Sequence, residues 1–323
     1  MIKIIAEFCQ NHNGNFDLLA KMVEAAARAG ATHGKMQSIF ADTVVFRPQF
    51  EEGLTQSDEL KSIKRPYKEE YLRLKGLEIS SNDTISFIQL CKDNGIIPMT
   101  TCFARSHTLE LADLGFESIK VASYDCASFP LLRDLAKSFK EIIVSTGATY
   151  NDEVAHAASV LKGSNFSFLH CVTIYPTPLE HLNLARMEWL RSYSPVVGFS
   201  DHSKISETGL LASKAALALG AEIIERHFTL LPESETRDGP VSVNEHQLKE
   251  LSDFAQLSQE ERLYQIEQEF PEWECMIGVR NRKLSDAELL NRDYYRGRFA
   301  SPRNESINGS RMIFNWEELS VYD

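Results

Sequence analysis

Polar and ionisable residues stand at the ends of eight short apolar runs in this sequence. In chain order they are Glu7 and His12, Lys35 and Gln37, Thr100 and Thr101, Lys120 and Ser123, Ser145 and Thr146, Thr173 and Tyr175, Ser200 and His202, and His227. A single Ser or Thr in such a place usually only caps the helix that follows. Lys35, Lys120, His202 and His227 among these ends need another explanation, so the pattern predicts an active site that binds an anionic substrate with the help of a metal ion.

His202 and His227 are the predicted metal ligands. A lone histidine is more often a hydrogen-bonded structural residue, but two on adjacent strands can reach one divalent ion. With few other protein ligands, the ion would keep positions for water or substrate, as a catalytic metal requires. His12 is either a third ligand or the residue that holds the turn at 11–14, and we favour the turn. A metal-dependent hydrolase is disfavoured, because those usually carry H-x-H after the first strand.

Lys35 and Lys120 lie inside runs that should be largely buried. Burying an unpaired ammonium is costly, so each lysine needs a charged partner. One interpretation is an internal salt bridge with Glu7 or Asp125. The other is that both lysines neutralise a carboxylate or phosphate of a substrate, with the hydroxyl and backbone donors of residues 145–147 on the same anion. A Schiff-base role for one lysine also stays open.

Strand and helix patterns alternate along the chain, which predicts βα units on a parallel sheet. The predicted strands are 3–8, 33–38, 96–101, 118–122, 141–145, 167–171, 196–199 and 222–226. The predicted helices are 16–29, 80–94, 107–114, 128–138, 150–162, 185–192, 206–219 and 245–258. Eight strands, each followed by a helix, indicate an α/β fold of the (β/α)8 TIM-barrel type, in which all strand ends meet on one face. A doubly wound sheet is the alternative, but no G-x-G-x-x-G follows the first strand.

Two segments do not follow this alternation of strands and helices. Residues 40–79 are a charge-rich connection where most connections run about 2–6 residues, and ordered loops of this length are usually lids or binding loops. Residues 276–323 read as a short, irregular C-terminal extension. We therefore predict a catalytic barrel over residues 1–275 and the extension over residues 276–323.

The amino-acid composition excludes several classes of protein. Of the 323 residues, 43% are hydrophobic and 25% are charged, which excludes a disordered or fibrous chain. The 34 Lys and Arg against 46 Asp and Glu give a net charge of −12, which argues against nucleic acid or an anionic membrane as partner. No transmembrane segment or signal peptide stands out. The six cysteines form no C-x-x-C pair and read as reduced, buried thiols, so we expect a soluble cytoplasmic protein.

Several of these segments carry a resemblance to the sialic acid synthases, which are N-acetylneuraminate synthase and its legionaminic and pseudaminic acid relatives. The segments are IIAEFCQNHNG, KMQ, TTCF, KVASYD, STG, LHCVTIYPTP, GFSDHS and IERHFTL, one in each βα unit and in the right order. The resemblance implies condensation of phosphoenolpyruvate with the open-chain aldehyde of an N-acetylated amino sugar, giving a nonulosonic acid and phosphate. It also implies a divalent cation, Mn²⁺ or Mg²⁺.

The resemblance assigns a role to each candidate residue. Phosphoenolpyruvate would lie against Lys35, Thr101, Lys120, Ser123, Ser145, Thr173 and Ser200. His202 and His227 would hold the cation that polarises the sugar aldehyde. Glu7 would handle the metal-associated water and proton transfer, so Glu7, Lys35 and Lys120 are the predicted catalytic residues. Gln37, Asp125 and Tyr175 would contact the sugar.

Three departures from the family pattern concern the sugar side. Asp125 stands where the family commonly has Glu, and no acid follows Gly239-Pro240, although Asp238 just before it could substitute. The tail is also shorter than the antifreeze-like domain of about 60 residues with which the family usually ends. That domain forms the family's homodimer and supplies an arginine to the partner's site. Here the tail arginines Arg296, Arg298 or Arg303 could cover the site instead.

The identity of the acceptor therefore stays open. The same chemistry on another acceptor, such as a phosphorylated sugar, is the alternative reaction. A barrel that binds sugar without turnover is the alternative that is not an enzyme.

Overall fold

Eight parallel strands form a closed barrel in the computed structural model, which describes residues 2–307 and 310–322. The strands are β1 (Lys3–Cys9), β2 (His33–Gln37), β5 (Ile97–Thr101), β6 (Ser118–Val121), β7 (Glu141–Ser145), β8 (Phe166–Cys171), β9 (Val197–Asp201) and β10 (Ile223–Phe228). They pair in chain order, and β10 pairs with β1 to close the ring, with Glu7 opposite His227. The predicted (β/α)8 barrel is confirmed, and every predicted strand lies within two residues of the observed one.

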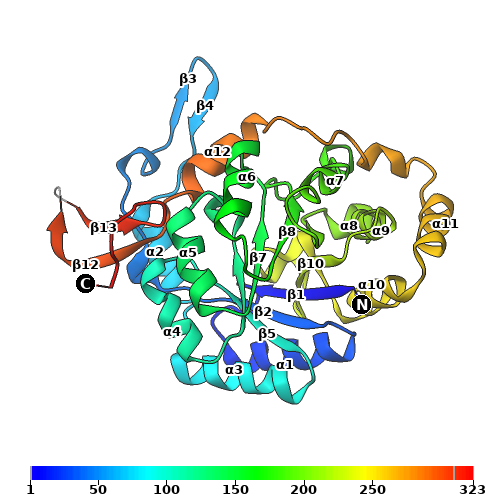
Figure 1. Cartoon of the computed structure of the whole chain (residues 1–323), viewed down its shortest axis with the longest axis horizontal. Helices are drawn as coiled ribbons and strands as arrows, with labels where there is room; N and C mark the ends of the chain where they lie inside the picture. The colour runs from blue at the N-terminus through cyan, green and yellow to red at the C-terminus, as the bar shows by residue number, and fades with distance from the viewer. Residues whose placement is uncertain (1, 308–309, 323) are drawn as a thin grey trace.

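Helices surround the barrel, as Figure 1 shows. They are α1 (Phe16–Arg28), α3 (Ser81–Asp93), α4 (Thr108–Asp113), α5 (Phe129–Ser138), α6 (Asn151–Val160), α7 (Arg186–Leu190), α8 (Ile205–Thr208), α9 (Leu211–Ala218), α10 (Glu245–Gln256) and α11 (Gln259–Glu269). The helix predicted at 206–219 is divided in two, because Gly209 has a φ of 53° and ends α8. Helix α11 was not predicted.

Side chains along each strand point alternately into the barrel and out toward the helices, which gives two separate apolar cores. Outward-facing residues such as Phe8, Phe168 and Phe199 join the large core between strands and helices. Inward-facing residues form a smaller apolar cluster within the barrel, made of Ile5, Met99, Ile143, Leu169 and Ile223. Because side chains on one face recur every second residue, the next inward positions toward the carboxyl ends carry the polar side chains Glu7, Thr101, Ser145, Cys171 and Glu225. The polar layer thus packs directly on the inner apolar layer.

The connection at 40–79 has its own secondary structure. It contains a hairpin of β3 (Leu54–Gln56) and β4 (Glu59–Ser62), which projects from the barrel in Figure 1, followed by α2 (Tyr67–Lys75). Part of it packs on the tail, because Val44 makes a β-bridge to Phe299 and both residues join a small separate core.

The tail is more regular than we expected. It contains α12 (Asp286–Tyr295), which contacts β4, and an antiparallel hairpin of β12 (Ala300–Ile307) and β13 (Ser310–Phe314). It follows the barrel without its own large core, and the division at residue 275 stays a prediction. Within the described residues, no helix is both long and apolar enough to cross a bilayer. All six thiols are free, but Cys275 is exposed rather than buried.

Candidate active site

A cavity of about 390 Å³ opens where the carboxyl ends of the barrel strands meet. Every predicted site residue except Asp125 lines it: Glu7, Lys35, Gln37, Thr101, Lys120, Ser123, Ser145, Thr173, Tyr175, Ser200, His202 and His227. The structure therefore brings these side chains together from all eight strands and the loops that follow them. Their individual roles stay predictions.

Asp125 does not line the cavity, and its expected contact with the sugar stays a prediction. Its carboxylate is buried after β6, where it accepts hydrogen bonds from Ser128 Oγ at 2.9 Å and from Asn315 Nδ2 at 2.9 Å. Burial raises the pKa of the Asp125 carboxyl. Because Asn315 belongs to the tail, Asp125 anchors the tail to the barrel.

Two buried lysines and two buried carboxylates form the floor of the cavity. Lys35 contacts Glu7, and its Nζ lies 3.5 Å from Glu225 Oε2. Lys120 Nζ donates to Ser145 Oγ at 2.6 Å and lies 3.8 Å from Glu225 Oε1. The internal salt bridge of Lys35 with Glu7 is thus present, whereas Lys120 does not use Asp125. Burial lowers the pKa of Lys35 to about 8.

Sequence reasoning missed Glu225, although it lies two residues before His227 on the same inward face of β10. Burial alone would raise its pKa, but Lys120 and Lys35 hold the pKa of Glu225 below its usual range. Glu225 therefore stays ionised and fixes both ammonium groups. Strict alternation from His227 was the signal that could have found it.

Several buried polar atoms in the cavity have no hydrogen-bond partner. Thr173 Oγ1, Glu225 Oε2 and His227 Nδ1 are among them, and all three residues line the cavity. Buried polar groups are normally paired, so such atoms mark places for a ligand. Ser200 Oγ instead donates to Glu225 Oε1 at 2.7 Å, and Ser123 Oγ accepts from the Gly147 amide at 3.1 Å.

The predicted metal ligands His202 and His227 lie with ring centroids 5.4 Å apart. Burial lowers the pKa of both, that of His202 to about 3, so both imidazoles are neutral, as metal ligands must be. The ring of Tyr175 contacts that of His202 in a tilted arrangement, with 4.0 Å between ring centroids.

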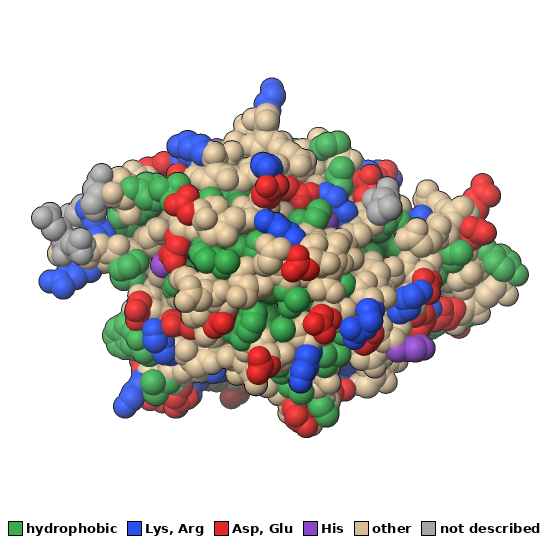
Figure 2. All heavy atoms as spheres, turned by 90° about the horizontal axis from the view of Figure 1, so that it is seen from below, with side chains coloured by type: hydrophobic (Ala, Val, Ile, Leu, Met, Phe, Trp, Pro, Cys, Tyr) green, Lys and Arg blue, Asp and Glu red, His purple; other side chains and the backbone are tan. Residues whose placement is uncertain are grey.

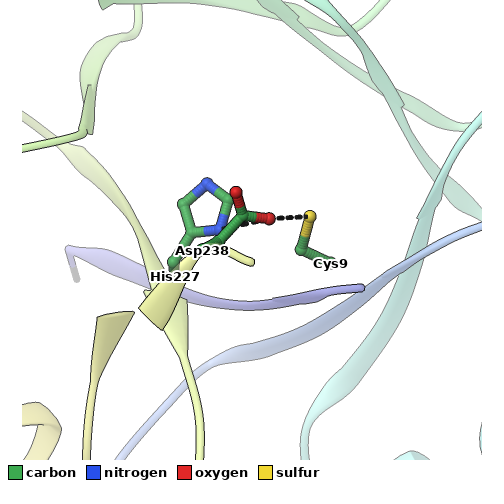
Figure 3. Close-up of side chains that lie close together, drawn as sticks. All are labelled: Cys9, His227 and Asp238. Atoms are coloured by element: carbon green, nitrogen blue, oxygen red, sulfur yellow. Dashed lines mark hydrogen bonds and ion pairs between the residues drawn. The ribbon is translucent and has the colours of Figure 1, made fainter. Parts of the chain in front are cut away.

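A second set of donors surrounds His227, as Figure 3 shows. Ligand atoms of Cys9, His227 and Asp238 all lie within 4.8 Å of one another. Cys9 Sγ donates to Asp238 Oδ2 at 2.9 Å, and His227 Nδ1 lies 3.9 Å from the same oxygen. A thiol, an imidazole and a carboxylate fit a transition metal such as Zn²⁺, Fe²⁺ or Co²⁺ better than Mg²⁺, which prefers oxygen ligands. Sequence reasoning missed Cys9 because it read every cysteine as structural.

Four arginines line the outer part of the cavity: Arg65, Arg73, Arg237 and Arg298. Of the three tail arginines considered from the sequence, Arg298 is therefore the one that reaches the cavity. Arg296 instead lies 3.4 Å from Glu153, and Arg303 does not line the cavity.

The comparisons with known proteins agree with this geometry. Residues 22–263 match the NeuB family. The chain is 34% identical over 262 residues to the N,N'-diacetyllegionaminic acid synthase of Campylobacter jejuni, covering 77% of this chain and 73% of that protein. It is 30% identical over 252 residues to the human N-acetylneuraminate-9-phosphate synthase, covering 77% and 67%.

Two solved structures have a similar fold. The N-acetylneuraminic acid synthetase of Leptospira borgpetersenii superposes with a TM-score of 0.68 at 28% identity, covering 84% of this chain and 91% of that one. The SpsE spore coat polysaccharide biosynthesis protein of Bacillus subtilis, at 24% identity and a TM-score of 0.71, shares the fold. Its site motifs, its barrel and its matched residues place this chain in the NeuB family, to which the sialic acid synthases belong.

Proposed function

We propose that this protein is a metal-dependent synthase that joins phosphoenolpyruvate to the open-chain aldehyde of an N-acetylated amino sugar, giving a nonulosonic acid and inorganic phosphate. The observation that carries the proposal is the cavity floor, where two buried lysines and a group of hydroxyls lie beside a set of metal-ligating side chains. Membership of the NeuB family supports the same reaction class.

The floor suits the anionic groups of phosphoenolpyruvate. Lys35 and Lys120 supply two positive charges, and Thr173 Oγ1 is a buried hydroxyl that has no partner. Charge-assisted hydrogen bonds of this kind are the strong ones, and they are pre-positioned here because Glu225 holds both ammonium groups. Such preorganisation stabilises phosphate as it leaves.

The metal would be held by His227 and Asp238 with Cys9 or His202. A bound divalent ion supplies Lewis acidity that polarises the sugar aldehyde. Carbon 3 of phosphoenolpyruvate then forms the new bond to the aldehyde carbon, and a water oxygen adds to carbon 2. The carbon 2–oxygen bond to phosphate breaks, and the keto group of the product remains.

In this proposal, Glu7 receives the proton of that water. Its carboxylate accepts a hydrogen bond from the Cys9 amide at 2.6 Å and contacts Lys35, so its position is fixed on both sides. The aldehyde oxygen takes up a proton and becomes a hydroxyl, so protons balance over the reaction. Glu7 and Lys35 form the proton-handling pair of the floor.

The test is consumption of phosphoenolpyruvate with a panel of amino sugars, each with Mn²⁺, Co²⁺ or Zn²⁺ and with EDTA. We expect consumption with at least one sugar, loss with EDTA, and recovery on adding metal. His227→Ala should lose this turnover and keep the thermal midpoint of the parent. Binding of phosphoenolpyruvate with no consumption for any sugar would contradict the proposal and leave a binding protein.

A further inference from the structure

Four guanidinium groups gather at the outer part of the cavity. Arg65 precedes α2, Arg73 lies within α2, Arg237 lies in the loop after β10, and Arg298 comes from the tail between α12 and β12. Three segments far apart in the sequence thus bring positive charge to one place. We call Arg65, Arg73, Arg237 and Arg298 the guanidinium rim.

Glu70 is the carboxylate that the rim shares. Arg73 binds it through two hydrogen bonds of 2.9 Å, Arg298 Nη1 donates to Glu70 Oε1 at 3.0 Å, and Arg237 Nη1 lies 3.9 Å from Oε2. Burial alone would raise the pKa of Glu70, but these arginines lower it to about 2. Within the described residues, Glu70 is the one carboxylate that hydrogen bonds or ion pairs join to these four arginines, so the rim as a set is positively charged.

Donors of the rim are free to bind a ligand. Arg298 is 8% exposed, and its Nε has no hydrogen-bond partner. Its guanidinium is held between the rings of Tyr295 and Phe299, at 4.9 and 4.4 Å from their centroids. Within the part of the chain that the structure describes, the Arg65 guanidinium has no hydrogen bond or ion pair at all, although it lines the cavity.

We propose that the guanidinium rim binds a phosphate group carried by the acceptor, so that the acceptor is an N-acetylated amino sugar phosphate. This inference rests on the proposed function. Phosphoenolpyruvate has its own cations in the floor, so the rim is available to a second anion. A positively charged set of several guanidinium groups matches a phosphate dianion better than a single carboxylate, because planar guanidinium groups bind phosphate in two-point fashion.

Binding can be tested without turnover. The probe is N-acetylmannosaminitol 6-phosphate, which lacks an aldehyde, and the comparisons are the unphosphorylated alditol and N-acetylmannosaminuronic acid that has likewise been reduced at its aldehyde carbon. We expect calorimetry, with phosphoenolpyruvate present, to show the phosphate binding at least about tenfold more tightly than either. Equal affinity for phosphorylated and neutral alditol would overturn the inference. Equal affinity for the uronic acid would overturn the choice of phosphate.

Variants connect the binding to the rim. Arg65→Gln and Arg237→Gln should each lower the affinity for the phosphate probe by about tenfold. The affinity for the neutral alditol should change less than twofold. Arg65 makes no contact that the fold needs, so its variant should fold normally. The matched control is Arg28→Gln, which removes an exposed arginine paired with Glu245 at the end of α1. Unchanged probe affinity in Arg65→Gln and Arg237→Gln would overturn the inference.

Turnover separates the two proposals. If the phosphorylated amino sugar consumes phosphoenolpyruvate with a much higher kcat/KM than the neutral one, both stand. If only the neutral sugar reacts, the synthase stands and the phosphate site is wrong. If neither sugar reacts but the probe binds in an Arg65-dependent way, the phosphate site in the rim is supported and the proposed reaction is wrong.

Discussion

Cys9 lies at an irregular point of the first strand. The register between β1 and β2 shifts between Glu7 and Cys9, and Cys9 has a φ of 46°. A left-handed conformation at a residue other than glycine costs about 1 kcal/mol, and such positions cluster at functional sites. The turned backbone carries the Sγ to Asp238, and Gln37 Nε2 donates to the same sulfur at 3.0 Å. The thiol is thus positioned from two sides.

We predict that Cys9 is a metal ligand. Co²⁺ bound to the native protein should show a sulfur-to-metal charge-transfer band in the near ultraviolet. Cys9→Ser should abolish the band and weaken Co²⁺ binding by about 10–100-fold, the range known even for outer-shell partners. Cys275→Ser is the control, because Cys275 is exposed and lies outside the cavity. Co²⁺ binding without this band in the native protein would show that His202 and His227 hold the metal without the Cys9 thiol. A band that survives in Cys9→Ser would assign the sulfur ligand to another cysteine, such as Cys171, which also lines the cavity.

The sequence predicted those site residues that strand alternation controls. Lys35, Thr101, Lys120 and Ser145 follow from the strand pattern, because every second residue of a barrel strand faces inward. Asp125 did not follow from it, because a residue beyond the strand end is directed by its tertiary contacts, here with Asn315. The rim arginines could not be predicted either, since loops and tail bring them together.

At the scale of elements, the connection at 40–79 and the tail pack against each other. Helix α2 is rich in charge and buries only Glu70 and Leu74, so its sequence has almost no apolar stripe and we did not predict it. Leu74 packs with Val44 and Phe299 in the small separate core. Because some partners of this helix, such as Phe299, lie more than 200 residues away, the local pattern alone could not reveal it.

Arg47 links the connection to the tail and gives a test at this scale. Its guanidinium donates to the carbonyl oxygens of Tyr294 at 2.5 Å, Arg296 at 3.1 Å and Asp293 at 3.3 Å, which lie at and just beyond the C-terminal end of α12. Positively charged donors at a helix C-terminus stabilise it. Arg47→Ala should therefore destabilise α12 locally by about 2–3 kcal/mol.

Hydrogen exchange of α12 measures that loss, and we expect exchange to accelerate there and not in the barrel strands. Binding of the alditol phosphate should weaken, because Arg298 follows α12, while phosphoenolpyruvate binding should stay unchanged. The control is Lys64→Ala, which removes an exposed lysine from the same connection. Unchanged exchange in Arg47→Ala would mean that the tail is held by its core contacts alone.

Glu141 ties together the amino ends of four strands. Its carboxylate pairs with Lys3 of β1, accepts from Ser118 Oγ of β6 at 2.6 Å and lies 3.5 Å from His33 Nε2 of β2. Burial alone would raise its pKa, but these partners lower the pKa of Glu141 to about 2. A depressed carboxyl pKa gives stability that is present above the unfolded value and is lost as the pH falls through the folded value.

Glu141→Gln should therefore reduce the free energy of unfolding at pH 7 by on the order of 2 kcal/mol. The difference from the parent should shrink as the pH falls from about 4.5 toward about 2. Urea unfolding of both proteins at pH 7, 4 and 3 measures it. Glu117→Gln is the control, because Glu117 pairs with Lys140 in an exposed position. Turnover should not change, since Glu141 lies at the end of the barrel opposite the cavity.

At the scale of the whole molecule, overall charge and site charge have opposite signs. The chain carries a net charge of −12, and Figure 2 shows acidic and basic side chains interspersed over one face. The cavity instead gathers Lys35 and Lys120 below the four rim arginines. A local field of this kind draws an anionic substrate to a protein that is acidic as a whole.

Arg298 reaches the cavity of its own barrel and pairs there with Glu70, so the tail supplies an arginine to the site of the same chain. We therefore predict that specific activity stays constant on dilution, whatever the oligomeric state. Initial rates should be compared with the molecular mass from light scattering over the same concentrations.

Mixing two inactive variants gives the sharper test. Lys120→Ala removes a floor lysine and Arg298→Gln removes the tail arginine, so each should lose turnover. If one chain supplies both groups, a mixture of the two variants that has been unfolded and refolded together stays inactive. If the tail of one copy serves the barrel of another, mixed oligomers contain an intact site and partial activity returns, which would contradict the single-chain site.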